Sequence, residues 1–430
     1  MKTFIKSIMK VLIIVVITIF GFKIIQRMNF NGLQIGTGKE STSVFSRDKD
    51  VKYNGEQSYK IESDNYSDAM IFKTINTEKN SVYKVSCKVK TKDVECEDGE
   101  YGGFNICMKD KVNKSPSLSG TNDWTDMIFY FNSYNSEKID IGFRLGENTG
   151  DCKGTVWIAD MKIEQGIFQK NKKWNFATFI INNTDLTVGN EKIKQTLNSS
   201  QKSSISRCMS KFKSTCESFS NGRMEIDYQI FDLDDTLKSI SYDANVGYAI
   251  TQKDVYKIIN DYLYKQNENF DHIFIVANIG DKISNEKIDW IGLGGTLYDN
   301  IGFSNIRISG DTLKSYNISS YNTFAEEVFL HEFLHTLEHN MKDIGYENII
   351  ALHDNEKYNY ENKSREGLKK WYYAYMNSEI TSNKVALTDE VYNTQPVNEE
   401  SFNTSYELKD YFYEDRTVIQ KISEKISRIF

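Results

Sequence analysis

Hydrophobic and polar residues alternate along short segments of the chain between residues 30 and 167. These segments are QSYKIES, SVYKVSCKVKT, GFNICMK, TDMIFYFNS, IDIGFRLG and TVWIADMKIEQ. Gly, Asn, Asp and Ser separate them at intervals of roughly 8–20 residues, as between the strands of all-β proteins. With a hydrophobic residue at every second position, one face of each segment can pack on a core. The helical repeat of 3.6 residues is not seen in these segments. Residues 30–167 are therefore expected to form an all-β sandwich or jelly roll.

Beyond residue 172 the pattern changes to strands that alternate with helices. NFATFIINNTDLTV, MEIDYQIFDL and FDHIFIVANI predict strands, and residues 190–220 have a polar helical pattern. A second helix is predicted over residues 251–266, with an apolar face made of Val255, Ile258, Ile259 and Leu263. This order predicts an α/β sheet domain over residues 172–385. Residues 386–430 are expected to form a polar tail that ends in an amphipathic helix.

The first 29 residues have the pattern of a targeting segment. Three lysines precede the uncharged run of residues 11–22, and Lys23 and Arg27 follow it. Such a run is typical of a secretory signal, and it is shorter than the roughly 20 residues that span a bilayer. It contains no alanine for a typical cleavage site, so the segment is either a cleaved signal or a membrane anchor flanked by snorkelling lysines. In both cases the remaining chain is expected at the extracellular face.

Charge and cysteine content narrow the functional classes. The net charge of −7 excludes the basic surface that nucleic-acid-binding proteins carry. The six cysteines lack the CxxC spacing of a zinc site, and an exported chain permits disulfides. Cys208 and Cys216 are two helical turns apart, which is too far for them to bond each other. The sequence leaves open whether the cysteines form disulfides or remain buried thiols.

Three of the five histidines fall within the segment EEVFLHEFLHTLEHN. The preceding residues Thr323-Phe-Ala-Glu326 have the pattern of a capping box, and Gly345 is a suitable helix stop. A helix is therefore expected to carry these histidines.

The spacing of the polar residues on this helix predicts a zinc site. His331 and His335 are four residues apart, so both imidazoles project from one face and can share one Zn²⁺. Glu332 lies about 100° round the helix, where it can act on a zinc-activated water without binding the metal. We expect Glu332 to be the general base of a hydrolase.

The HEFLH motif resembles that of the zincin metallopeptidases, and the resemblance extends from about residue 172 to 380. The astacin- and adamalysin-like zincins continue HExxHxxGxxH. In this chain the glycine position is Glu338 and the last histidine position is Met341, so that subgroup pattern fails. Glu338 is expected to hydrogen-bond the second nitrogen of a ligating histidine. His339 points away from the motif's face and is expected not to bind metal. His272, which opens a strand, is expected to be structural.

The third zinc ligand has to come from elsewhere in the chain. Thermolysin-like zincins take a glutamate from a second helix about 20 residues downstream. The matching window here offers His353, Asp354 and Glu356. We favour His353 because imidazole suits zinc. Asp354 is the second candidate ligand, or else it orients a ligating histidine, and Glu356 is the third candidate.

Two further features complete the expected peptidase site. The glycine-rich stretch at residues 289–300, DWIGLGGTLYDN, reads either as an edge strand that a substrate backbone approaches or as a turn. Because a tyrosine often stabilises the oxyanion in zincins, Tyr358 and Tyr360 are the candidates for that role.

The N-terminal region carries a second resemblance. YNGEQSYKIES, GTNDWTDMIFYFNS and GTVWIADMKIEQG resemble bacterial carbohydrate-binding jelly rolls with a galactose-binding-like fold. This resemblance implies glycan or cell-wall polysaccharide as a partner, and a structural Ca²⁺ near Asp160. Trp124 and Trp157 either stack on a sugar ring or, as is more usual for tryptophan at a strand start, belong to the core.

Together these features predict an exported zinc metallopeptidase. A glycan-binding module is expected to hold it at cell-wall or glycoprotein glycans, where it hydrolyses a peptide or protein substrate. Two alternatives remain open from the sequence. One is a surface adhesin with a structural zinc site, which needs a fourth protein ligand such as His339 or Glu356. The other is a zinc amidase that acts on cell-wall peptide linkages.

Overall fold

The computed structural model divides the chain into two compact units, Met1–Ile167 with Glu399–Phe430, and Phe168–Asn398. It describes residues 33–37, 43–97, 102–147, 151–167, 170–264, 270–280, 282–283, 286–288, 290–308, 326–362, 364–395, 402 and 406–407. The targeting segment, Thr323 and the predicted C-terminal helix lie outside the described residues. None of the helices that the structure describes has the length and apolar character needed to cross a membrane.

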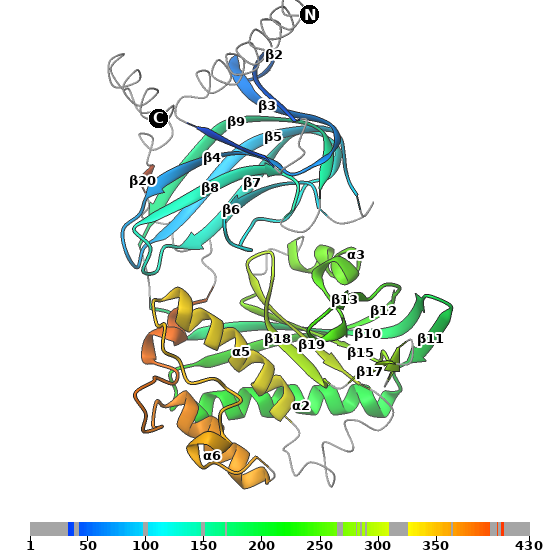
Figure 1. The fold of residues 1–430 in the computed structure, drawn as a ribbon, viewed down its shortest axis with the longest axis vertical. Coiled ribbons are helices and arrows are strands. Elements are labelled where there is room, and N and C mark those ends of the chain that lie inside the picture. The colour runs from blue at the N-terminus through cyan, green and yellow to red at the C-terminus, as the bar shows by residue number, and fades with distance from the viewer. Residues whose placement is uncertain are drawn as a thin grey trace, which may run out of the picture. The chain divides into compact units, whose positions relative to one another are not determined.

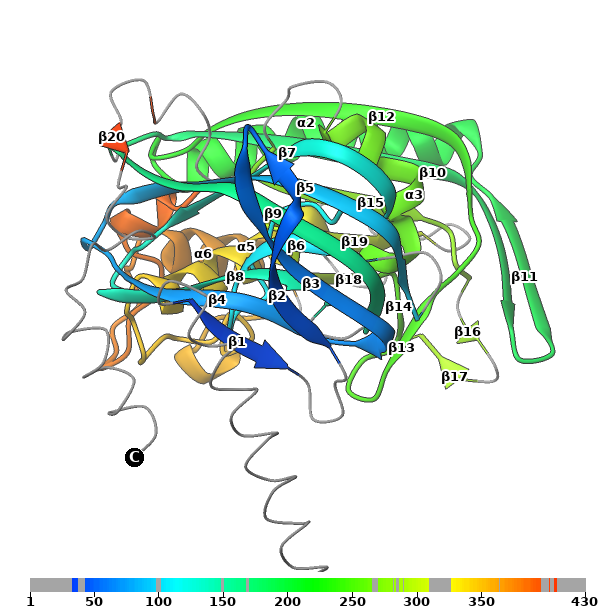
Figure 2. The same ribbon diagram turned by 90° about the horizontal axis from the view of Figure 1, so that it is seen from above.

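The first unit is an antiparallel sandwich of two sheets, and Figure 2 shows the strands of its larger sheet side by side. The smaller sheet has the order β1 (Gln34–Thr37), β4 (Ala69–Asn76), β8 (Lys138–Leu145) and β6 (Phe104–Met108). The larger sheet has the order β2 (Val44–Tyr53), β3 (Glu56–Ser67), β9 (Cys152–Gly166), β5 (Val82–Cys96) and β7 (Gly120–Asn132), and β20 (Tyr406–Glu407) pairs with β9. The predicted all-β sandwich is confirmed.

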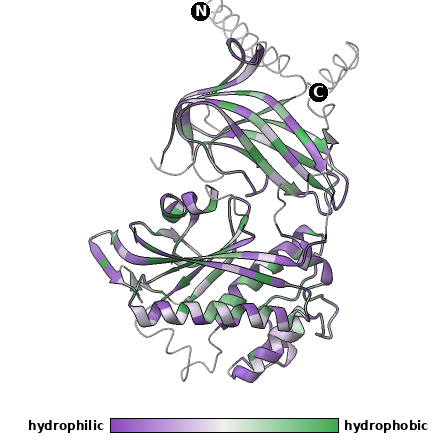
Figure 3. Cartoon of the chain, turned by 180° about the vertical axis from the view of Figure 1, so that it is seen from behind, coloured by the Kyte–Doolittle hydropathy of each residue, from purple (hydrophilic) through white to green (hydrophobic). Residues whose placement is uncertain are grey.

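Alternation of side chains builds the core of this sandwich, as the changing colours along its strands in Figure 3 show. In β5, Val85, Cys87 and Val89 are buried between the sheets, while the residues between them are less buried. Cys96 and Cys152 face each other across β5 and β9 and form a disulfide. The other four cysteines are buried free thiols, Cys208 and Cys216 among them.

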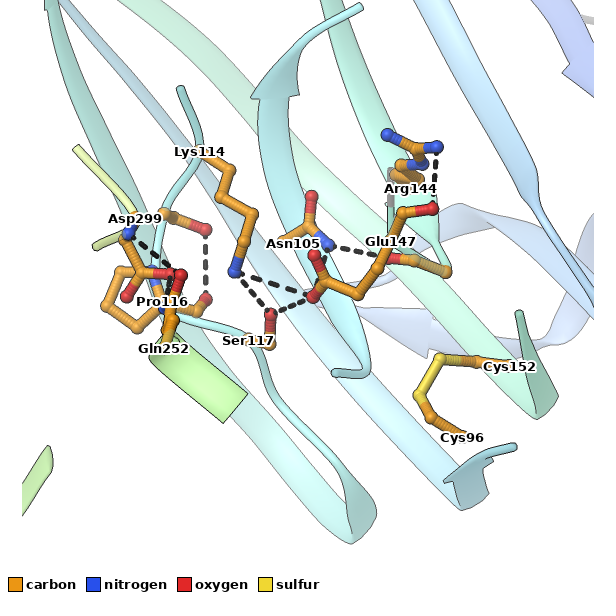
Figure 4. A network of polar contacts seen from close by, with 12 residues as sticks. Cys96, Asn105, Lys114, Pro116, Ser117, Arg144, Glu147, Cys152, Gln252 and Asp299 are labelled. Atoms are coloured by element: carbon orange, nitrogen blue, oxygen red, sulfur yellow. Dashed lines mark hydrogen bonds and ion pairs between the residues drawn. A yellow bond between two sulfur atoms is a disulfide. The ribbon is translucent and has the colours of Figure 1, made fainter. Parts of the chain in front are cut away.

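Buried charges in the sandwich are paired with one another (Figure 4). Ser117 donates a hydrogen bond of 2.6 Å to the Glu147 carboxylate, and the Lys114 ammonium lies 3.4 Å from the same carboxylate. The Arg144 guanidinium donates to both carboxylate oxygens of Asp68, at 2.6 and 2.7 Å. These groups satisfy one another, so removing one partner would leave a buried charge without its partner and destabilise the sandwich.

The second unit contains a mixed sheet with helices on both faces (Figure 1). Its strands are β12 (Glu225–Leu237), β10 (Lys173–Val188), β15 (His272–Ala277), β19 (Ile301–Arg307) and β18 (Gly292–Tyr298), in that order across the sheet. The first four are mutually parallel, and β18 runs antiparallel to β19 at the edge. The strand β11 (Glu191–Thr196) pairs with the end of β10. Short hairpins form from β13 (Ser241–Asp243) with β14 (Gly247–Ala249) and from β16 (Lys282–Ile283) with β17 (Glu286–Lys287).

The two faces of this sheet have separate cores. The helices α2 (Ser199–Phe219), α5 (Glu327–Asp343) and α6 (Arg365–Met376) share one core with Phe176 and Phe274 of the sheet. The helix α3 (Gln252–Tyr264) shares the other core with Phe179 and Ile275. Neighbouring residues of one strand thus serve opposite faces, because strand side chains alternate.

Two predicted boundaries in this unit were wrong. The helix expected over residues 190–220 begins only at Ser199, because residues 191–196 form a hairpin with β10, and a capping box of Asn198 and Gln201 starts the helix. The expected polar tail from residue 386 is part of the core up to Tyr392, whose backbone carbonyl accepts a hydrogen bond from Trp174. The 3-10 helix η2 (Asp389–Asn393) carries this buried segment.

Candidate metal centre

The helix α5 carries the HEFLH motif and packs against the core of the second unit. Phe329, Leu330, Phe333 and Leu334 are fully buried and anchor the helix against the sheet. This packing turns the two motif histidines, His331 and His335, away from the core. The capping box expected from Thr323 and Glu326 involves a residue outside the described part of the chain, and the Glu326 carboxylate accepts a hydrogen bond of 3.0 Å from Thr215 of α2.

Three imidazoles converge beside this helix. The His353 Nε2 atom lies 3.0 Å from the Nε2 atoms of both His331 and His335. In the part of the chain that the structure describes, these three residues are the one group of three or more His, Cys, Asp or Glu side chains arranged to hold a metal ion. The structure therefore brings together both histidines of the motif and the favoured downstream histidine.

The loop that carries His353 is held in place by hydrogen bonds to both neighbouring helices. The Leu352 N–H donates to the Glu338 carboxylate of α5 at 3.3 Å. The Leu352 carbonyl accepts from the indole of Trp371 in α6 at 2.9 Å. The two hydrogen bonds of Leu352 therefore fix the backbone next to His353, although His353 itself lies in a loop and not in a helix.

Each motif histidine has a hydrogen-bond partner at its Nδ1 atom. His335 Nδ1 lies 3.0 Å from a carboxylate oxygen of Glu338, which is the contact expected from the sequence. His331 Nδ1 lies 2.8 Å from the hydroxyl of Tyr372 in α6, and this hydroxyl donates a 2.5 Å hydrogen bond to Glu327. Such partners fix the ring orientation and leave Nε2 as the free donor atom.

The donor set fits zinc. Zinc–nitrogen bonds of 2.0–2.1 Å in a tetrahedron place ligand nitrogens about 3.3 Å apart, close to the observed 3.0 Å. Burial, followed by the nearby His335 and His353, holds the pKa of His331 well below its ordinary value. Burial also lowers the pKa of His353. Both rings are therefore neutral at pH 7, as metal ligands have to be.

Glu332 lies beside the three histidines and against strand β18. Its side chain is only 5% exposed. Burial and the charge of Glu327 raise the pKa of Glu332 well above its ordinary value, and a hydrogen bond from the Gly294 backbone partly opposes them. A carboxylate with a raised pKa is suited to take up and release a proton near neutral pH.

The glycines of β18 allow this strand to lie directly on α5. A Cβ at Gly294 would stand 2.2 Å from the Glu332 carbonyl oxygen, and one at Gly292 would stand 2.5 Å from the Glu332 side chain. The pairing of β18 with β19 shifts register between Leu293 and Thr296, which frees the intervening glycines from the ladder. The stretch read as an edge strand or a turn is therefore an edge strand with a bulge beside Glu332.

A cleft of about 550 Å³ contains this site. Its lining comes from Trp290 and the first half of β18 on one side and from one face of α5 on the other, with His353 completing it. Glu332 and all three converging histidines border the cleft, so a ligand that enters it meets the imidazole group and the carboxylate together.

Other residues of the third-ligand window lie elsewhere. The Asp354 carboxylate pairs with the Lys357 ammonium at 3.2 Å and is not part of the converging group, so its candidacy as a ligand is not supported. Glu356 begins the exposed 3-10 helix η1 (Glu356–Tyr358) and is also outside the group.

The two tyrosines expected to stabilise an oxyanion lie outside the lining of the cleft. Tyr358 stacks on Trp371 with ring centroids 6.3 Å apart, and its hydroxyl lies 3.2 Å from that of Ser382. Tyr360 packs against the same indole at 5.3 Å. Neither residue lines the cleft, because η1 and the left-handed Asn359 turn both rings onto α6.

The remaining two histidines lie outside the converging group. His339 lies outside the converging group, with its Nε2 4.0 Å from an Asp343 carboxylate oxygen. His272 is the fully buried first residue of β15, where its ring hydrogen-bonds to Ser304 at 3.1 Å, and burial lowers its pKa to about 3. His272 is therefore a neutral core residue.

The candidate ligand residues of the first unit have structural contacts. Trp157 is buried and donates a 2.8 Å hydrogen bond to Asp48, and Trp124 packs at 5.4 Å against Tyr53. The Asp160 carboxylate, near which a calcium ion was expected, pairs with Lys162 at 3.0 Å. We therefore find no support for calcium at Asp160.

Two site residues escaped the sequence analysis. Glu327 precedes His331 by one helical turn, a spacing that signals contact and that could have identified it. Tyr372 comes from a helix that was not predicted, and in a chain with 26 tyrosines no local pattern distinguishes it.

The close approach of β18 to α5 makes a direct prediction. Gly294→Ala is expected to push the strand away from Glu332, to lower stability by about 1–3 kcal/mol and to reduce any activity of the site. Thermal unfolding and zinc-dependent hydrolysis measure the two effects. Gly189→Asn is the control, since a Cβ there meets nothing within 4 Å and asparagine tolerates its φ of +58°. Equal behaviour of the two variants would contradict the close packing.

Comparison with known proteins gives similarity to solved structures only. No protein-family model and no curated protein matches the chain. The catalytic domain of a tailspike protein from bacteriophage CBA120 is 11% identical with a TM-score of 0.25, over 32% of this chain and 20% of that one. A carbohydrate-binding module in complex with β-1,4-galactotriose is 12% identical with a TM-score of 0.24, over 32% and 91%.

A xylan-binding domain from Paenibacillus barcinonensis is also 12% identical, with a TM-score of 0.22 over 30% of this chain and 85% of that domain. TM-scores of this size carry no argument about fold or function. The sandwich of the first unit rests on its own strand pairing.

Proposed function

We propose that this protein is a zinc-dependent metallopeptidase whose zinc ligands are His331, His335 and His353. One observation carries the proposal: three imidazole nitrogens converge next to a buried carboxylate in a single cleft. Three protein ligands leave one position of a tetrahedral zinc ion open, as catalytic sites require. A structural site closes that position with a fourth residue, and no fourth His, Cys, Asp or Glu joins the group among the described residues.

The residues of the chain divide the chemistry among them. A bound zinc ion supplies Lewis acidity, which activates water and polarises the scissile carbonyl. Glu332, which borders the cleft beside the three histidines, would accept the proton of the attacking water and deliver it to the leaving amine. A hydrogen bond from the Gly294 backbone connects the Glu332 carboxyl group to strand β18, which borders the same cleft.

The edge strand β18 gives a peptide substrate a place to bind. It pairs with β19 on one side only and lines the cleft with its glycines. An extended peptide can add to such an edge through backbone hydrogen bonds, and the missing side chains allow close approach. This arrangement favours a peptide or protein substrate over a small molecule.

The remaining parts of the proposal concern location. We propose that residues 1–29 export the chain and either anchor it to the membrane or are removed, and that the sandwich binds glycan or cell-wall polysaccharide. The pattern of the first 29 residues and the all-β architecture of residues 33–167 support these roles. Binding of the purified protein to insoluble polysaccharides, with and without added zinc, tests the glycan part separately from the peptidase part.

Metal removal tests the activity. The full-length protein is expected to cleave a labelled unstructured protein, to lose this activity with a chelator, and to regain it with about one equivalent of zinc. Peptidoglycan fragments are assayed in parallel, and cleavage of these alone would favour a zinc amidase. Zinc binding without hydrolysis of either substrate would favour the adhesin with a structural zinc site.

A further inference from the structure

The two histidines of the HEFLH motif are supported in different ways. Glu338 accepts directly from His335 Nδ1 at 3.0 Å. The nearest carboxylate to His331 is that of Glu327, but its oxygen lies 4.0 Å from Nδ1, which is too far for a hydrogen bond. The hydroxyl of Tyr372 fills this gap, 2.8 Å from the imidazole and 2.5 Å from the carboxylate.

We propose that Tyr372 and Glu327 are positioning residues that fix His331 for zinc binding. The inference rests on the proposed function and adds the device that holds one of its ligands. Neither residue belongs to the converging group of donors, and both reach that group through the Nδ1 side of His331, so we place them as supports of this ligand.

The hydrogen bonds of this relay run in one direction. A histidine that binds a metal through Nε2 carries its proton on Nδ1, so His331 donates to the Tyr372 oxygen. That oxygen donates its own proton to Glu327. The largely buried carboxylate of Glu327 ends the chain, and as the final acceptor it polarises the imidazole through the intervening hydroxyl.

The relay also connects two helices. Glu327 and His331 lie one turn apart on α5, and Tyr372 comes from α6. Tyr372 is 2% exposed and its ring is packed in the core of the unit, so its hydroxyl has little freedom to move. The imidazole therefore takes its orientation from the packing of α6 as well as from its own helix.

Tyr372→Phe removes the central hydroxyl and keeps the ring. We expect zinc affinity, measured by competition with a chromophoric chelator on the full-length protein, to fall by about 10–100-fold. Glu327→Ala, which leaves the ring in place, is expected to lower affinity by about 10-fold. It serves as the second variant if Tyr372→Phe does not fold, as judged by circular dichroism.

Tyr375→Phe is the matched control. Tyr375 is buried on the same helix, and its hydroxyl donates a 2.9 Å hydrogen bond to the Ile350 carbonyl without contacting a histidine. We expect this variant to keep parental zinc affinity to within about threefold, despite a comparable loss of stability. If Tyr372→Phe and Glu327→Ala bind zinc as tightly as Tyr375→Phe, the relay is overturned. If the parent protein itself binds no zinc, the proposed function fails instead.

Discussion

Replacing Glu332 by glutamine is expected to lower kcat/KM for peptide hydrolysis by at least about 100-fold while the zinc content of the protein stays unchanged. Glutamine keeps the size of the side chain and loses its capacity to accept a proton. Since a positioned general base contributes about 10²–10⁴-fold, kcat/KM should fall by at least the lower of these factors. The Glu332 side chain is outside the group of converging imidazoles, so metal analysis should give the same zinc per chain as for the parent.

Glu366→Gln is the control for this experiment. Glu366 lies on the exposed face of α6, where it makes only a loose ion pair with Lys370 at 3.9 Å. It should keep full activity, because an exposed pair of this kind contributes little to stability. Activity of Glu332→Gln equal to that of the control would show that another group is the base. Loss of zinc from Glu332→Gln would show that Glu332 is a ligand.

Replacing His353 by alanine is expected to remove zinc from the purified protein. The substitution leaves only the two imidazoles of α5, whereas a catalytic zinc ion is held by three protein ligands. Loss of a residue that hydrogen-bonds a ligating histidine lowers metal affinity by about 10–100-fold, so loss of a ligand should lower zinc affinity by more than about 100-fold. The rise in thermal unfolding temperature on adding zinc should disappear, since a ligand stabilises only the folded state that binds it.

His339→Ala provides the comparison for that variant. His339 belongs to the same helix and borders the same cleft, but it is outside the converging group. It should retain near-stoichiometric zinc and the zinc-dependent rise in unfolding temperature. The reverse result, with zinc lost from His339→Ala and kept by His353→Ala, would overturn the ligand assignment.

The geometry of one helix explains how much of the site the sequence predicts. Spacing of three or four residues on a helix determines which side chains meet, so His331, His335 and the contact of Glu338 follow from the motif. His353 follows from chemistry, because imidazole was the best zinc donor in the downstream window. The sandwich of the first unit was predicted in a similar way, from the alternation of hydrophobic and polar residues along each strand.

Contacts that depend on tertiary packing were missed or wrong. Tyr372 reaches His331 only because α6 packs on α5, and no local pattern records that packing. Tyr358 and Tyr360 were chosen by sequence distance from His353, yet the turn at Asn359 directs both toward Trp371. Residues 386–392 look polar as a segment, but Leu387 and Tyr392 within it are buried. A few buried residues can thus determine the position of a polar segment.

X-ray absorption at the zinc edge of the full-length protein tests the central claim most directly, because it reports which atoms bind the metal. The account predicts three nitrogen ligands at about 2.0–2.1 Å and one oxygen from solvent. In His353→Ala the edge signal should be lost with the metal. A parent spectrum with four protein ligands, or one that contains sulfur, would contradict an open catalytic site. Absence of zinc from the folded parent protein would contradict the metallopeptidase itself.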